Sequence, residues 1–103
     1  MLPFELTSNA ENDLKEIALY TQSMWGEKQA IRYSDLIDKR FHEIANGAAY
    51  SRLFSSRYAQ LFVTRCEHHY IFYIQKKDVK PSIIAILHES MNMLSWIEER
   101  LNM

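Results

Sequence analysis

The strongest constraint on the fold is a pair of apolar stripes at helical spacing with a single glycine between them. The first stripe covers residues 9–25, and the second begins after Gly26 and ends at Asn46-Gly47. Because so little chain separates the two helices, we expect them to fold back as an antiparallel helical hairpin. Ser8 and Glu11 have the spacing of a capping box, which places the start of the first helix at about residue 9.

Beyond residue 56 the apolar pattern alternates instead of following a helical period. Three runs rich in β-branched and aromatic residues cover residues 57–65, 69–76 and 82–88. The links between these runs are too short for a parallel crossover, which predicts a three-stranded antiparallel meander. A shorter alternating run predicts an N-terminal strand at residues 3–7, and we expect residues 48–56 to be irregular.

The C-terminal segment has an apolar stripe at helical spacing, which predicts a short helix capped by Ser90 or Asn92. The predicted order is therefore strand, two helices, three strands and a last helix. This order is typical of the α+β class, and a chain of 103 residues is the size of a single domain, residues 1–103.

The middle strand of the meander is apolar on both faces. Tyr70 and Phe72 alternate with Ile71 and Tyr73, so each face carries large apolar side chains. The helical hairpin can cover one face. We expect the other face to be covered by a second protein.

Composition limits the class of protein. The single cysteine excludes an internal disulfide, and neither a signal peptide nor a membrane span is apparent, which predicts a cytoplasmic protein. The net charge is −1, with a basic segment at residues 47–80 between two acidic ones. Such a chain lacks the strong positive field of proteins that bind many phosphates, so we expect no direct sequence-specific binding of nucleic acid.

The sequence Cys66-Glu67-His68-His69 contains residue types found in metal sites and catalytic centres. A structural zinc site needs ligands from separated pairs, and there is no second cluster of this kind in the sequence. Adjacent residues of an extended chain point to opposite faces, so the two histidines cannot easily share a metal. We therefore interpret the cluster as a polar hairpin turn, with no metal or cofactor.

Two further features of the sequence each allow two interpretations. Arg57 and Arg65 bracket one predicted strand and His88 ends another, which is compatible with a weak anion site, although solvated charges at the sheet rim are favoured. Trp96 lies off the main stripe of the last helix. It is either an interface anchor or a seal on a small core.

Several motifs occur in an order that is similar to a known family. They lie in residues 24–46, 70–74 and 86–92. The matching positions are Trp25-Gly26, Ala30 and Tyr33, Ile71 to Tyr73, Leu87-His88 and Met91. Asn92 stands where the family usually has Asp, and Asn46-Gly47 replaces its Asn-Pro. Over about residues 3–93 the chain resembles the ParE toxins of the RelE/ParE superfamily.

The resemblance implies the fold of that superfamily and the role of a toxin in a type II toxin–antitoxin system, which serves plasmid or chromosome maintenance. Such a toxin inhibits DNA gyrase without enzymatic activity and blocks replication. A ParD-like antitoxin neutralises it by covering it with a disordered C-terminal segment that orders on binding, which predicts a hetero-oligomer.

We assign candidate contacts to both partners. The candidate contacts with gyrase are Arg57, Arg65, His88, Met91 and Trp96. The candidate contacts with the antitoxin are Trp25, Tyr33 and Tyr73.

Two alternatives share the predicted fold. A RelE-like ribosome-dependent mRNA endonuclease would need basic and acid–base groups on the sheet, and only Arg57, Arg65 and His88 could supply them. A degenerate, non-toxic toxin that serves only as an interaction module is the other alternative.

Overall fold

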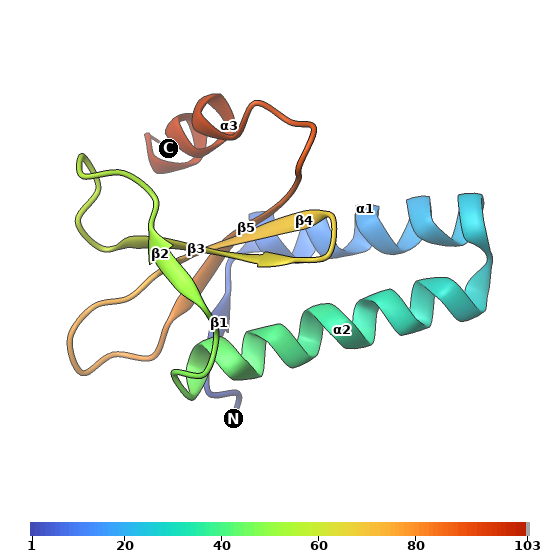
Figure 1. The fold of residues 1–103 in the computed structure, drawn as a ribbon, viewed down its shortest axis with the longest axis horizontal. Coiled ribbons are helices and arrows are strands. Elements are labelled where there is room, and N and C mark those ends of the chain that lie inside the picture. Colours follow the sequence, from blue (N-terminus) through green and yellow to red (C-terminus); the bar gives the residue numbers. More distant parts are fainter. Residues whose placement is uncertain (103) are drawn as a thin grey trace.

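The computed structural model describes residues 1–102, which form one five-stranded sheet with three helices (Figure 1). The elements are β1 (Glu5–Leu6), α1 (Ser8–Trp25), α2 (Glu27–Ala45), β2 (Ser51–Leu53), β3 (Leu61–Cys66), β4 (His69–Ile74), β5 (Ser82–His88) and α3 (Met93–Leu101). The strand order is β1-β5-β4-β3-β2, in which only the β1–β5 pair is parallel. The predicted α+β fold, with its helical hairpin, antiparallel meander and C-terminal helix, is confirmed.

Gly26 both ends α1 and precedes α2. Its φ of 93° lies in the region that favours glycine, and its amide donates to the Gln22 carbonyl at 2.9 Å. The N-cap of α1 is Thr7, whose hydroxyl accepts from the Ala10 amide at 3.2 Å, and Ser8 is already helical. The predicted cap at Ser8 was therefore wrong by one residue, because a Thr and a Ser that can both cap a helix stand side by side.

The sheet also differs from the prediction at its β2 edge. Residues 51–53 pair with residues 62–64 of β3, although this segment was predicted to be irregular. Three residues are too few to give a recognisable alternating pattern. The strand predicted from residue 57 begins at Leu61, because the Leu61 amide donates to the Tyr58 carbonyl at 3.1 Å in the turn before it.

Apolar side chains pack on both faces of the sheet. The helical hairpin covers one face, where Ile37, Phe41, Ile71 and Ile83 are buried. The other face is covered by α3 and the loop before β3, so that α3 and α2 lie on opposite sides of the sheet in Figure 1.

The expectation that a second protein covers this other face of β4 was wrong. Phe72 is fully buried, and the ring of Phe54 meets it edge-on at 5.1 Å between centroids. Ile97 of α3 is also fully buried against this face. The chain thus supplies both covers itself. None of the helices described here has the length and apolar character needed to cross a membrane.

Candidate functional site

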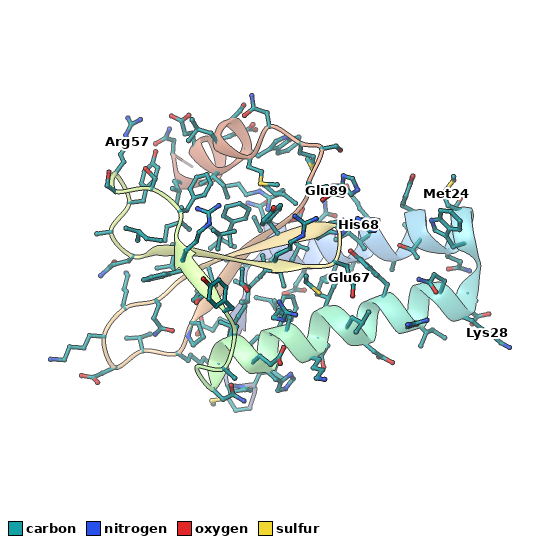
Figure 2. The ribbon with its side chains drawn as sticks, viewed as in Figure 1. Met24, Lys28, Arg57, Glu67, His68 and Glu89 are labelled. Atoms are coloured by element: carbon teal, nitrogen blue, oxygen red, sulfur yellow. The ribbon has the colours of Figure 1, made fainter. Side chains whose placement is uncertain are left out.

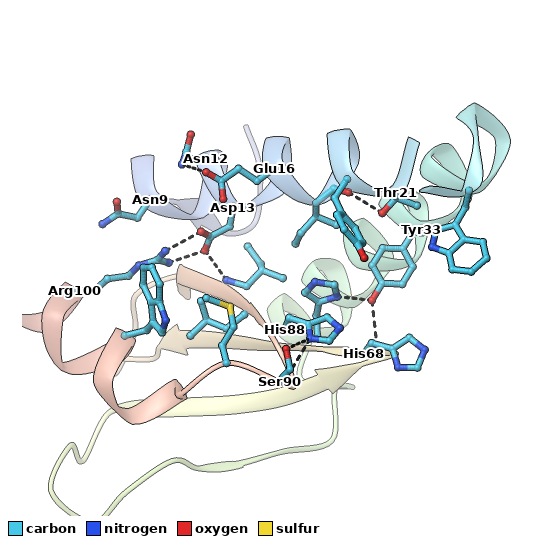
Figure 3. Close-up of a pocket in the computed structure, with 18 of the residues that line it drawn as sticks. Asn9, Asn12, Asp13, Glu16, Thr21, Tyr33, His68, His88, Ser90 and Arg100 are labelled. Carbon is cyan, nitrogen blue, oxygen red and sulfur yellow. Dashed lines mark hydrogen bonds and ion pairs between the residues drawn. The ribbon is translucent and has the colours of Figure 1, made fainter. Parts of the chain in front are cut away.

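A groove of about 1170 Å³ runs between α1 and the segment that follows β5 (Figure 3). Its floor includes Ile86 and Leu87 of β5, and the β3–β4 turn contributes His68. The wall formed by the C-terminal segment includes Met91 and Trp96. The groove therefore lies where the first helix, the last strand and the last helix meet.

A buried ion pair joins α1 to α3 beside this groove. Two nitrogens of the Arg100 guanidinium donate to the two carboxylate oxygens of Asp13, at 2.6 and 2.8 Å. The Asp13 side chain is only 9% exposed and that of Arg100 only 12%. The hydrogen bonds to Asp13 are the main reason that the pKa of Arg100 is raised. A bidentate contact of this kind fixes the relative orientation of the two side chains as well as their distance.

The same two side chains also bond to backbone groups of β5 along the edge where that strand has no neighbouring strand. Strand β1 pairs with β5 only at Ser82 and Ile83. Beyond that point the Ile86 amide donates to Asp13 Oδ2 at 2.9 Å, and the Ile84 carbonyl accepts from Arg100 at 3.0 Å. Because buried backbone groups need partners, the two side chains do here what a longer β1 would otherwise do.

Three histidines lie near the other end of the groove. The Tyr33 hydroxyl is 2.6 Å from His69 Nδ1 and accepts from the His68 amide at 3.3 Å. The rings of His69 and His88 meet edge-on at 5.1 Å. Burial, assisted by the neighbouring His88 and His68, lowers the pKa of His69 to about 4, whereas burial raises the pKa of Tyr33. His69 and Tyr33 are therefore both neutral at pH 7.

Glu89 ties the end of β5 to the β3–β4 turn. Its amide donates to the His68 carbonyl at 2.9 Å, and its carboxylate contacts both His68 Nδ1, at 2.9 Å, and Arg65. Arg65 also donates to the Tyr70 hydroxyl at 2.8 Å. The hydrogen bond with His68, followed by the attraction of Arg65, lowers the pKa of Glu89. The Arg65 guanidinium is therefore engaged by groups of the chain itself.

The candidate gyrase contacts do not form one cluster. Arg57 lies in the loop before β3, 3.8 Å from Glu98, at the other end of the sheet from the turn that carries His68 (Figure 2). Arg65 is paired with Glu89, and His88 is hydrogen-bonded to Ser90 at 2.7 Å. The three side chains therefore make no shared anion site, in agreement with the favoured interpretation as rim charges. His88, Met91 and Trp96 line the groove.

The three candidate antitoxin contacts differ in exposure. Trp25 is 71% exposed and lines the groove at the end of α1. Tyr33 is buried but also lines the groove. Tyr73 is buried in the core under α2, stacked on Phe62 at 5.8 Å, so its side chain offers little surface to a partner.

The Cys66 to His69 sequence is the predicted hairpin turn. Cys66 ends β3 and is buried, and burial raises the pKa of its thiol. His68 faces Glu89 while His69 faces Tyr33, so the two histidines have separate partners. In the described part of the chain no group of three His, Cys, Asp or Glu residues could hold a metal ion.

Asp13, Arg100 and the acidic residues beside them were not predicted from the sequence. Asp13 occupies a buried position of α1, as Ala10 and Thr21 do, and a carboxylate on an apolar helical face is a signal for a buried partner. Arg100 carries no comparable signal, because an arginine in the last turn of a helix is common for its interaction with the helix dipole.

Comparison with known proteins agrees with this architecture. Residues 4–93 match the model of the family described as the ParE toxin of the type II toxin–antitoxin system parDE. The chain is 34% identical to Toxin ParE of Escherichia coli over 98% of both chains. It is 29% identical to Toxin ParE1 of Caulobacter vibrioides, over 89% of this chain and 94% of that one.

A solved structure shares the fold. The chromosomal ParDE system from P. aeruginosa contains a chain that superposes with a TM-score of 0.68, at 17% identity, over 85% of this chain and 96% of that one. The family match and the identity to Toxin ParE both extend over most of the described elements. This chain therefore belongs to the ParE toxin family of type II toxin–antitoxin systems.

Proposed function

We propose that this ParE toxin inhibits DNA gyrase, stops replication and is neutralised by a ParD-like antitoxin. The observation that carries the proposal is the family match over residues 4–93, which contains every motif of the resemblance. Gyrase is the target that membership of this family implies. An action on gyrase places the toxin in the cytoplasm.

The polar groups of the sheet support a mechanism based on binding alone. An endonuclease of the RelE type would need free cations and an acid–base pair directed at one phosphate. Here Arg65 is engaged by Glu89 and Tyr70, and Arg57 lies at the other end of the sheet beside Glu98. These contacts favour a protein that poisons its target by contact over one that cleaves RNA.

Neutralisation by the antitoxin has a simple steric explanation if both partners use the groove. His88, Met91 and Trp96 line the groove and are candidate contacts with gyrase. Trp25 and Tyr33 line it as well and are candidate contacts with the antitoxin. The P. aeruginosa structure belongs to a ParDE system, and a hetero-oligomer of this kind is proposed for the present chain. An antitoxin segment in the groove would keep gyrase away.

The proposal is tested by inducing the chain alone in bacteria. We expect growth to stop, with double-strand breaks in the chromosome and an SOS response. We also expect a ParD-like antitoxin to be encoded by the neighbouring gene, and its co-expression to restore growth. Trp96→Ala should weaken the effect, whereas Leu94→Ala should not, because Leu94 is exposed on the same helix but does not line the groove.

The alternatives give different results in the same cells. Ribosome-dependent transcript cleavage with intact chromosomes would favour the mRNA endonuclease and contradict gyrase inhibition. Normal growth with the folded protein present would favour a degenerate interaction module.

A further inference from the structure

The groove exposes large aromatic side chains. Tyr20 and Trp25 of α1 are 65% and 71% exposed, and Trp96 of α3 is 40% exposed. All three line the groove, and Met91 adds a flexible apolar side chain to the same lining. Aromatic residues and methionine gathered in one concave surface are typical of the central part of a protein interface.

The groove is also acidic. Asp13, Glu16 and Glu99 line it, and Arg100 is the only lysine or arginine that does. Arg100 is already committed to Asp13 through two hydrogen bonds. Neither Glu16 nor Glu99 forms an ion pair within residues 1–102. Glu16 accepts a hydrogen bond from the Asn12 side chain at 3.2 Å, and both carboxylates contribute to the raised pKa of Arg100, which is already paired with Asp13.

Size and charge together select the kind of occupant. The volume of about 1170 Å³ is at or above the ~300–1,000 Å³ that is usual for small-molecule pockets, and it suits a segment of polypeptide. The carboxylates at the rim repel the phosphates of nucleic acids and attract the ammonium or guanidinium groups of a peptide. Apolar side chains of the same segment would find partners on Tyr20, Trp25 and Trp96.

We infer that the groove between α1 and α3 binds an apolar segment of the antitoxin that carries lysine or arginine side chains, and that Glu16 and Glu99 select these cations. The inference rests on the proposed function, because it names the chemistry of the antitoxin segment. It adds that recognition depends on charges at the rim of the groove as well as on apolar contact.

The test measures binding of the full-length antitoxin encoded beside this chain to the full-length toxin and to its variant Glu16→Lys/Glu99→Lys. Both glutamates are exposed, so the fold should be preserved, which circular dichroism and thermal unfolding can check. Asp35→Lys is the matched control, because Asp35 is exposed on α2 and does not line the groove.

We expect the double reversal to weaken binding by roughly tenfold or more, since it replaces two attractions by two repulsions, and the control to change it by no more than about twofold. We also expect the wild-type affinity to fall with salt more steeply than that of the double variant. An antitoxin whose Lys and Arg residues in the bound segment are changed to Glu should bind the double variant better than the wild-type toxin.

Two results would overturn the inference, and they are distinguishable. If the antitoxin binds both toxins with the same affinity and salt dependence, the groove charges select nothing, although the proposed toxin–antitoxin pair stands. If the antitoxin does not bind even the wild-type toxin, the proposed partner itself is wrong. Hydrogen exchange provides a second readout, since binding should protect α1, α3 and residues 86–91 and should leave β2 unprotected.

Discussion

At the scale of single residues, Asp13 and Arg100 hold helix α3 against α1 and β5. Removing two charges from water costs several kcal/mol per ion, and the cost is offset only where the geometry is good and the remaining hydrogen-bonding groups are satisfied. Here the two side chains bond to each other and to the backbone of Ile86 and Ile84. The pair therefore stabilises the fold mainly by joining α1, β5 and α3, and less through the attraction between its two charges.

Asp13→Asn is expected to lower the free energy of unfolding by about 3–5 kcal/mol, because it leaves the Arg100 guanidinium buried without a counter-charge. Urea unfolding followed by circular dichroism measures the change. Asp35→Asn, at an exposed position of α2, is the control and should change stability by no more than about 0.5 kcal/mol. A change of similar size in both variants would show that the pair does not hold α3 in place.

His69 gives the protein a pH-dependent stability. Its pKa in the folded chain is about 4, below the ordinary 6.5, so the unfolded chain binds more protons between these values. The contribution of neutral His69 to the free energy of unfolding is therefore fully present above pH 6.5 and is lost as the pH is lowered towards 4. His69→Gln keeps a hydrogen-bonding group beside Tyr33 but cannot titrate, so its loss of stability between pH 7 and 5 should be smaller than that of the wild type.

The control for this prediction is His42→Gln, at an exposed histidine of α2. It should lose stability with acid as the wild type does. Equal pH dependence in the wild type and in His69→Gln would contradict the prediction. Glu89, whose pKa is also lowered, loses its contribution only below its ordinary pKa of 4.5, so the range from pH 6.5 to 4.5 reports on His69.

Residue patterns predicted some of the site and missed the rest for a physical reason. Trp96 was identified because a large apolar side chain off the stripe of the last helix is visible in the sequence, and Met91 because it matches a motif of the resemblance. Asp13 and Arg100 are 87 residues apart, so nothing local links them. Tyr73 was expected at a partner surface, but the depth to which α2 buries it depends on tertiary packing.

At the scale of elements, α3 depends on its surroundings. A helix of nine residues is too short to be stable alone in water. It is held by the burial of Ile97, by Arg100 at its C-terminal end and by its N-cap, where the Asn92 side chain accepts from the Ser95 amide at 3.3 Å. Of the two caps considered from the sequence, Asn92 is the one used.

Asn92→Ala should lower the free energy of unfolding by about 1 kcal/mol, because it removes the cap. Asn92→Asp, the residue that the family usually has here, keeps the cap and places a negative charge at the positive end of the helix dipole, so stability should be unchanged or higher by about 0.3–1 kcal/mol. Chemical denaturation of the three proteins measures both effects. An Asp variant as unstable as the Ala variant would mean that the cap is not what this position provides.

The helices and strands differ in how clearly the sequence predicts them. α1 and α2 were predicted because their stripes persist over several turns and a glycine separates them, and that glycine, Gly26, has a φ of 93° in the structure. Strand β2 was missed because it has only three residues and takes its register from β3. The start of β3 was placed too early, because residues 57–60 alternate as a strand does but form a turn.

At the scale of the whole molecule, the chain covers both faces of its sheet and leaves the groove beside β5 open. The helical hairpin covers one face, and α3 with the preceding loop covers the other. The groove between α1 and the C-terminal segment therefore remains open to a partner, whereas the sheet face that the sequence suggested is covered. This arrangement is why we propose that antitoxin and target compete for the same place.

We propose that this ParE toxin acts on gyrase by binding and that its antitoxin prevents this action. The most direct measurement combines purified toxin, gyrase and supercoiled plasmid and follows cleaved DNA on a gel. We expect that wild-type toxin increases gyrase-dependent cleavage, that Trp96→Ala does so less, and that an equimolar amount of antitoxin abolishes the effect. Unchanged cleavage with a folded toxin at concentrations that stop growth in cells would contradict it.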